Sequence, residues 1–181
     1  KGVSPGGHDG RVWDNTSFGE GLRNTISLNG ASGTRFGPLH WSGNFDEVQD
    51  FEIQMEKLNG GTGLIPGQTF IDQSPLDMTT AGQSIDLDAL AAYVGSLGKD
   101  TVKHSPNRTY TGQLTAAALR GQALFSSTDL GDDSCASCHQ GAAFRDGKSH
   151  DVGTITVNSG GRLSGLLTEI RTPTLIELWD S

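Results

Sequence analysis

The feature that most constrains this chain is the spacing of its 2 cysteines, Cys135 and Cys138, which are followed at once by His139. A disulfide between cysteines this close would close a very tight ring and would leave the adjacent histidine unexplained. The pattern C-x-x-C-H is typical of covalent haem attachment, because two intervening residues let both sulfurs face one porphyrin edge. We therefore expect one haem c on Cys135 and Cys138, with His139 as the proximal ligand of its iron.

A partial zinc site and a thioredoxin-like redox pair are the alternatives for this motif. Structural zinc normally takes four ligands, and the chain has no second C-x-x-C. A thioredoxin-like pair belongs to a βαβ pattern, which the surrounding sequence lacks. The remaining histidines are scattered singly, and we expect a surface or loop position for each of them: His8, His40, His104 and His150.

The second axial position of the iron decides what a haem can do. Met55 lies in a helical pattern, which is typical of a core methionine. Met78 lies in a loop-like stretch, as a distal methionine often does, and His150 follows the haem motif closely. Met78 and His150 are thus the candidate distal ligands, and an open iron position is the alternative.

Composition narrows the class of partner. The net charge of −8 and the lack of any basic run argue against nucleic-acid binding. No apolar stretch is long enough to span a membrane. An acidic surface favours a redox partner with a basic patch, such as a small cytochrome or a cupredoxin. Only 34% of the residues are hydrophobic, so a buried porphyrin would supplement a thin core.

Apolar periodicity predicts three helices, at residues 45–58, 87–97 and 114–125. Ser84 or Asp86 can cap the second helix. Its expected buried stripe consists of Leu87, Leu90, Ala91 and Val94. Residues 1–45 read as irregular, residues 154–157 alternate weakly, and a short helix or turn is expected near residues 174–179.

These elements predict a mainly α, cytochrome c-like fold, with few helices and long loops around the covalently bound haem. A polar stretch at residues 99–111 separates two expected units. The first unit is residues 1–98, and the second is a haem module at residues 112–181.

Four segments of the second unit carry a family resemblance. LTAAALRGQALF at 114–125, CASCH, HDVG at 150–153 and TPTL at 172–175 occur in that order. Together they resemble the second cytochrome module of the bacterial di-haem cytochrome c peroxidase family, which includes the methylamine-utilisation di-haem enzyme. Upstream, GHDGRVWDN, GLRNTISLNG, PLHWSGNFDEVQDFE and LDALAAYVGSL resemble that family's first module, downstream of its haem motif.

The resemblance implies that residues 1–98 are a remnant of a first module without its own haem motif, and that the haem module is truncated at its C-terminus. Another chain or a dimer would then supply the missing segments. It further implies that Asn24 helps to hold a calcium ion and that Trp41 is an electron-transfer residue. The family's acid for peroxide cleavage has no match, because GGTGLI occupies residues 60–65.

The expected function is electron transfer through a single covalently bound haem. The alternative is a haem peroxidase or oxidase of the resembled family, acting on hydrogen peroxide, and the sequence leaves open whether the chain is an enzyme. Because haem is attached covalently outside the cytoplasm, we expect a periplasmic or extracellular bacterial protein.

Overall fold

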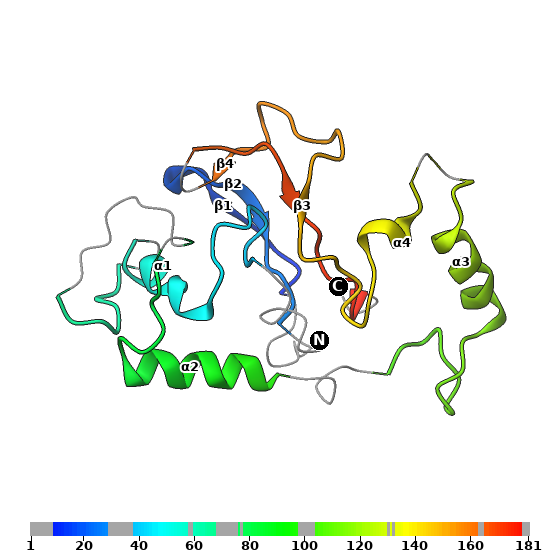
Figure 1. The fold of residues 1–181 in the computed structure, drawn as a ribbon, viewed down its shortest axis with the longest axis horizontal. Helices are drawn as coiled ribbons and strands as arrows, with labels where there is room; N and C mark the ends of the chain where they lie inside the picture. The colour runs from blue at the N-terminus through cyan, green and yellow to red at the C-terminus, as the bar shows by residue number, and fades with distance from the viewer. Residues whose placement is uncertain are drawn as a thin grey trace.

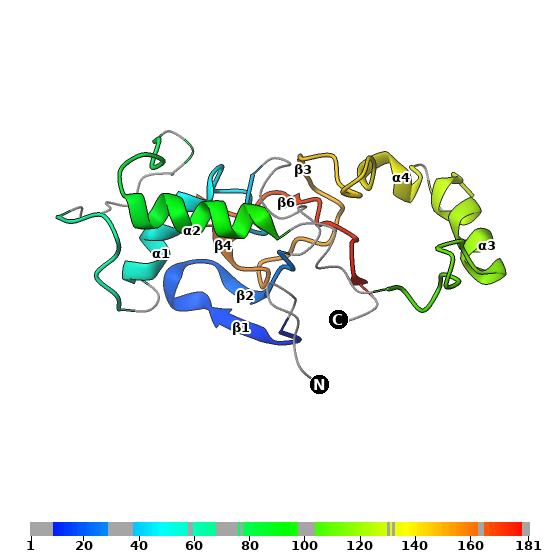
Figure 2. The same cartoon turned by 90° about the horizontal axis from the view of Figure 1, so that it is seen from below.

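The computed structural model describes residues 9–28, 38–57, 60–67, 76, 78–97, 104–129, 131, 133–162 and 165–178. The helices of this part are the 3-10 helices η1 (Thr16–Phe18) and η3 (Val48–Phe51) and the α-helices α1 (Glu52–Lys57), α2 (Ile85–Ser96), α3 (Ala116–Ser126) and α4 (Cys135–Cys138). The strands are β1 (Val12–Asn15), β2 (Gly21–Asn24), β3 (Ser149–His150), β4 (Gly161–Arg162), β5 (Gly165–Leu166) and β6 (Ile170–Arg171). Figures 1 and 2 show α3 at one end of the molecule, with α1 and α2 towards the other.

The predicted mainly α, cytochrome c-like fold is wrong. Helix accounts for 29% and strand for 14% of the described residues, and the rest is loop and turn. The strands form three two-stranded antiparallel sheets, β1–β2, β3–β6 and β4–β5. Long stretches rich in Gly, Asn, Ser and Thr lack the apolar period that would extend the helices.

The β1–β2 hairpin lies where the sequence predicted irregular structure. Val12 pairs with Asn24 and Asn15 with Gly21. Arg23 ties the hairpin to β4, because its guanidinium donates to the carbonyl oxygens of Ser159 at 2.9 Å and Gly161 at 2.8 Å. The hairpin therefore packs against a segment far along the chain.

This junction needs glycine. At Gly160, with φ +81°, a Cβ atom would lie 2.3 Å from the carbonyl oxygen of Glu20. A Cβ at Gly21 would in turn lie 2.9 Å from the Cα of Gly160. The two backbones approach this closely only because neither residue has a side chain.

The helix predicted at residues 45–58 begins later than expected. It starts as η3 at Val48 and continues as α1 to Lys57, and Leu58 lies outside the described residues. Phe45 instead forms a β-bridge with Leu39 and is fully buried. The side chain of Asp50 caps the start of η3. Its carboxylate accepts hydrogen bonds from the backbone N–H groups of Asp46 at 3.1 Å and Glu47 at 3.2 Å.

The helix predicted at residues 87–97 is confirmed as α2. Ser84 is its N-cap, and its hydroxyl accepts from the N–H of Leu87. The predicted stripe is wrong in part, because Leu87 is fully buried whereas Leu90 is 39% exposed. Only one turn of α2 therefore contributes to the core.

The third predicted helix is confirmed as α3, which Thr115 caps by accepting from the N–H of Ala118. None of its described side chains is buried. By contrast, the residues 154–157 form no strand, and residues 176–178 form a turn before the chain leaves the described part. The division at residues 99–111 stays a prediction, since only residues 104–111 are described.

The core is unusually polar. Its apolar members are Leu39, Phe45, Ile53, Ile65, Leu87, Leu97, Ala143 and Leu167. Its polar members are Glu20, Ser42, Asn44, Asp50, Glu52, Thr80, Arg145, Arg171, Thr172, Thr174 and Glu177. Hydrogen bonds between side chains and backbone therefore fix much of this fold, because buried polar groups are costly unless they are paired.

Three hydrogen bonds hold the segment around β6 against the rest of the fold. The N–H of Arg171 donates to the carbonyl of Trp41 at 2.9 Å. The N–H of Thr172 donates to Lys148 at 3.0 Å, and the hydroxyl of Thr174 donates to Ala143 at 2.8 Å. The loop after α4 is thus held from both of its ends.

Candidate functional site

The candidate site is built on α4, a single helical turn that contains the C-x-x-C motif. Cys135 is exposed and Cys138 is half-buried, and both are free thiols. The N–H of His139 donates to the carbonyl of Cys135 at 3.0 Å, which closes the turn. Because residues i and i+3 share one face of a helix, the turn presents both thiols to the same side.

The imidazole of His139 is held by the loop that follows α4. Its Nδ1 donates a hydrogen bond to the carbonyl oxygen of Phe144 at 3.0 Å. Phe144 adopts φ +49°, at the end of a turn that starts at Gly141. Histidines that bind metals commonly donate their second ring N–H to a carbonyl in this way. The bond leaves Nε2 of His139 available as a ligand atom.

One aromatic ring lies near this imidazole, and further apolar side chains on α3 and at Phe144 are exposed. The ring of Phe125, on α3, lies 6.5 Å from that of His139 and 6.4 Å from that of Phe144, centroid to centroid. Leu119 is 53% exposed, Leu124 50% and Phe144 44%. Exposed apolar surface of this kind marks a place where a ligand or another chain binds.

These observations fit a covalently bound haem. The motif offers two free thiols on one turn, an imidazole whose second nitrogen is already bonded, and adjacent apolar surface that the described residues leave open. A porphyrin needs the same set of groups. The assignment of Cys135, Cys138 and His139 stays a prediction.

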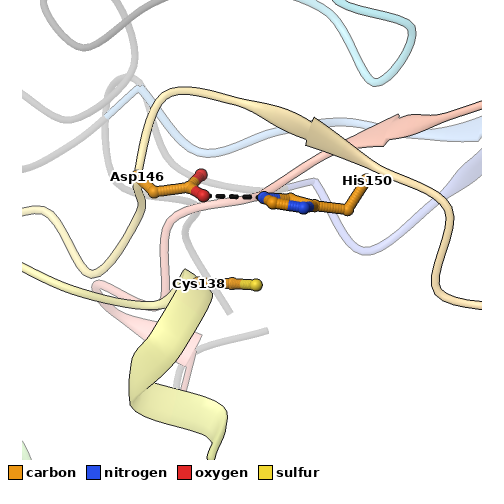
Figure 3. A group of neighbouring side chains, drawn as sticks. All are labelled: Cys138, Asp146 and His150. Carbon is orange, nitrogen blue, oxygen red and sulfur yellow. Dashed lines mark hydrogen bonds and ion pairs between the residues drawn. The ribbon is translucent and has the colours of Figure 1, made fainter. Parts of the chain in front are cut away.

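A second group of side chains lies directly beside the motif. Ligand atoms of Cys138, Asp146 and His150 all lie within 4.8 Å of one another (Figure 3). Nε2 of His150 and Oδ2 of Asp146 are 2.7 Å apart. Burial alone would raise the pKa of Asp146, but hydrogen bonds from Lys148, His150 and Thr172 outweigh it and lower the pKa to about 2. Sequence reasoning missed Asp146, although it lies only 4 residues before His150.

The structure places the two candidate distal ligands differently. His150 is the second residue of β3 and pairs with Asp146 beside Cys138. Met78 is 37% exposed and lies in the segment leading into α2, which is well separated from α4 in both views (Figures 1 and 2). Neither assignment is tested by these contacts.

Trp41 and Asn24 are brought together. The indole N–H of Trp41 donates to the backbone carbonyl of Asn24 at 2.8 Å. Both line an open pocket of about 390 Å³, whose other lining residues are Leu22, Arg23, Asn158, Ser159, Leu167 and Ile170. The calcium role of Asn24 and the electron-transfer role of Trp41 stay predictions, because they came from the family resemblance alone.

His40 is more enclosed than its predicted surface or loop position suggests. It lies in a loop, but its ring packs 4.5 Å from that of Phe45 and 5.0 Å from that of Phe51. Burial lowers the pKa of His40 to about 4, against the opposing effect of its hydrogen bond with Asn44. His104 is exposed, and His8 lies outside the described residues.

Two buried arginines, Arg145 and Arg171, lie near the site and were not singled out by the sequence. Arg145 is 4% exposed and Arg171 is 2% exposed. Sequence reasoning expects an arginine to lie on the surface, because arginine is rarely buried. No periodic pattern or motif marks Arg145 or Arg171 as an exception.

Within the described residues, no helix combines the length and apolar character needed to cross a membrane.

Comparison with known proteins corrects the family. No protein-family model matches the chain. The chain is 30% identical, over 162 residues, to the hydrazine synthase subunit gamma of Kuenenia stuttgartiensis. The match covers 84% of this chain and 41% of the relative, so the chain spans about two fifths of that protein.

A solved structure of Kuenenia stuttgartiensis hydrazine synthase, pressurised with 20 bar of xenon, has a chain with the same fold. The TM-score is 0.62 at 24% identity, over 96% of this chain and 62% of the other. The expected resemblance to di-haem cytochrome c peroxidases and the methylamine-utilisation enzyme is therefore wrong. The chain is similar instead to the gamma subunit of hydrazine synthase.

Proposed function

We propose that this chain carries one covalently bound haem c on Cys135, Cys138 and His139 and transfers electrons within a multi-subunit enzyme. The hydrogen bond from His139 Nδ1 to the Phe144 carbonyl carries the proposal, because it orients the imidazole and leaves Nε2 as the nitrogen that can bind iron. The likeness to a hydrazine synthase subunit supports both the assembly and the redox setting.

Each part of the site has a separate task in this proposal. A bound haem supplies an iron that accepts one electron and gives it up again. Cys135 and Cys138 would attach the group, and His139 would bind its iron through Nε2. Phe144 orients the imidazole through its carbonyl. Phe125, which lies beside His139, and the exposed Leu119 and Leu124 of α3 would help to exclude water from the bound group.

The assembly suggested by the relative is a hydrazine synthase-like complex, in which this chain would pass electrons between a redox protein and a catalytic subunit. The acidic character of the chain favours partners that carry a basic patch. Because haem is attached covalently outside the cytoplasm, the proposal includes a periplasmic or extracellular location. The peroxidase alternative rested on the corrected resemblance and is dropped.

Haem attachment is tested by expressing the natural full-length protein in a bacterial periplasm together with haem-attachment proteins. Intact mass under denaturing conditions should show one haem per chain for the Cys135–Cys138 motif. Cys135→Ala combined with Cys138→Ala should lose it, while Ser137→Ala, which changes the motif without altering its spacing, should keep it. A wild-type protein without covalent haem would overturn the proposal.

A divalent metal site is the second candidate, favoured by the cluster of Cys138, Asp146 and His150 (Figure 3). Three protein ligands and a water are typical of a catalytic zinc site. This alternative leaves Cys135 and His139 without a role. Elemental analysis separates the two: loss of metal in His150→Ala, with no haem in the wild type, would favour the metal site.

A further inference from the structure

Glu52, the first residue of α1, is a fully buried carboxylate that is bonded on one side only. Its exposed fraction is 0%. Oε1 accepts hydrogen bonds from the backbone N–H of Leu64 and, at 2.7 Å, from that of Ile65. Oε2 is buried as well, but it has no hydrogen-bond partner among the described residues. Because a carboxylate is costly to bury unless it is paired, Oε2 lacks a partner that the fold requires.

Glu56 brings a second carboxylate to the same place from the next turn of α1. It is half-buried. A Cβ atom at Gly63 would collide with Oε1 of Glu52 and would lie 2.8 Å from Oε1 of Glu56. The two carboxylates therefore converge on Gly63, whose φ of +70° and missing side chain permit this approach. Two like charges that meet in a buried place repel each other unless a positive charge lies between them.

The protein itself does not supply that positive charge within the part of the chain that the structure describes. Neither carboxylate forms an ion pair there. The loop that follows α1, residues 60–65 with the sequence GGTGLI, has no charged side chain. The N–H of Gly61 donates to the carbonyl of Met55 at 3.0 Å, which holds this loop against α1. The loop thus offers backbone carbonyl oxygens beside the two carboxylates, but no cation.

A proton on Glu52 is the simplest alternative to a bound cation, and the hydrogen bonds argue against it. Oε1 already accepts two N–H groups, so the proton would sit on Oε2. A buried carboxyl O–H needs an acceptor, and Oε2 has no partner of any kind among the residues that the structure describes. A cation has no such need, because it binds the lone pairs of both carboxylates directly.

The donor atoms decide which class of cation suits the site. Zinc prefers nitrogen and sulfur ligands, which neither glutamate nor the loop 60–65 offers. Ca²⁺ takes carboxylates and backbone carbonyl oxygens in a flexible arrangement, whereas Mg²⁺ demands a near-ideal octahedron. Two carboxylates from one helix and a glycine-rich loop therefore favour Ca²⁺.

We propose that Glu52 and Glu56, together with backbone carbonyls of the loop 60–65, bind a Ca²⁺ ion that holds this loop on α1. The ion supplies the charge that makes the burial of Glu52 favourable. The site is separate from Asn24 on β2, for which the family resemblance implied a calcium role. It is also independent of the haem motif on α4, since α1 and α4 lie well apart in both views (Figures 1 and 2).

The test uses the natural full-length protein, stripped of divalent ions with a chelator, and four single variants of it. Glu52→Gln and Glu56→Gln each remove one charge with little change of shape. Glu169→Gln removes an exposed carboxylate as the matched control, and Asn24→Ala probes the other calcium candidate. Binding of Ca²⁺ and of Mg²⁺ is measured by isothermal titration calorimetry, and the midpoint of thermal unfolding is measured with and without Ca²⁺.

Ca²⁺ should raise the unfolding midpoint of the wild type and of Glu169→Gln, because it binds only the folded chain. Glu56→Gln should bind Ca²⁺ at least ~10-fold more weakly, and Glu52→Gln should lose this site entirely. Without Ca²⁺, Glu52→Gln should unfold at a higher temperature than the wild type, since it removes an unmatched buried charge. Mg²⁺ should bind the wild type more weakly than Ca²⁺ does.

A wild type that neither binds Ca²⁺ nor gains stability from it would overturn the proposal. So would a calcium response that survives in both glutamate variants, or one that is lost only in Asn24→Ala. If Glu52→Gln does not fold, the half-buried Glu56 gives the decisive variant, and full calcium binding by Glu56→Gln would then count against the site. Loss of haem from the protein bears on the proposed function alone, because the calcium titrations do not depend on it.

Discussion

Oδ2 of Asp146 lies 2.7 Å from Nε2 of His150, across the turn that connects the haem-motif loop to β3. The carboxylate is only 6% exposed, and it also accepts from the N–H of Lys148 at 3.0 Å. Asp146 therefore links two parts of the fold, the loop that holds His139 and the β3–β6 pair. Its carboxylate stays ionised, because these hydrogen bonds lower its pKa.

This contact predicts an acid-labile fold. Burial opposes the charge of Asp146, but its hydrogen bonds prevail and lower its pKa to about 2, from 3.8. The stabilisation is present above the unfolded pKa and is lost as pH falls from ~4 to ~2, by about 2 kcal/mol. Urea titrations across this range should show the loss in the wild type.

Asp146→Asn should remove this pH dependence and cost about 2 kcal/mol at neutral pH. Asp129→Asn, at an exposed position, serves as the control and should behave like the wild type. An Asp146→Asn protein as stable as the control at pH 7 would contradict the assignment.

His40 predicts a second pH effect, over a different range. Burial lowers its pKa from 6.5 to about 4, and the charges of Arg171 and Arg23 add to the effect. The unfolded chain binds this proton first, so stability falls as pH drops from ~6.5 to ~4, by about 3 kcal/mol. His40→Asn should flatten this part of the stability profile, because asparagine does not titrate. Asparagine also tolerates the φ of +67° at this position, so the variant should fold.

His104 offers the matched control for that experiment. It is exposed, and its ring contacts only the carbonyl of Thr109 among the contacts that the structure describes. His104→Asn should leave the fall in stability between pH 6.5 and 4 unchanged. If the His40→Asn variant kept this loss of stability between pH 6.5 and 4, another titrating group would be its cause.

The junction of Gly160 with Glu20 predicts a large effect of one methyl group. A Cβ at Gly160 would lie 2.3 Å from the Glu20 carbonyl oxygen, at a backbone φ of +81°. Gly160→Ala should therefore lower the free energy of unfolding by about 3 kcal/mol. Gly153 has a similar φ of +72° but open space around it, so Gly153→Ala should cost only about 1 kcal/mol. Equal losses in the two variants, measured by denaturant titration, would show that the close approach is absent.

Helix α3 predicts a dependence on haem. None of its described side chains is buried, and an isolated helix of 11 residues is marginal in water. Hydrogen exchange of the α3 amides should slow at least ~10-fold when haem is attached, compared with the variant lacking both cysteines. The amides of α2, which Leu87 anchors in the core, provide the internal control. Equal exchange of α3 in both forms would mean that haem does not cover it.

Local signals in the sequence were reliable where a side chain acts on its own neighbours. Ser84 caps α2 and Thr115 caps α3, as hydroxyls preceding apolar periods do. The helix predicted from residue 45 starts too early. Phe45 fits the helical spacing, but its backbone forms a β-bridge with Leu39, and apolar periodicity does not reveal such a bridge.

Long-range pairing explains the larger errors. The strands β3 to β6 are two residues long, so alternation cannot reveal them, and their partners are set by tertiary contacts. Arg171 is another case, because its sequence neighbours do not show that the strand pair buries it. The spacing of the cysteines and the histidine reveals the C-x-x-C-H motif. Asp146 and Arg145 carry no such signal, because only the folded loop shows where their side chains lie.

The open position of Cys135 has a consequence for how the protein is made. Cys135 is exposed at the first residue of α4, while the loop after α4 is already held at Ala143, Lys148 and Ser149. A haem bound as proposed would therefore meet an accessible thiol on a backbone that hydrogen bonds already hold in place.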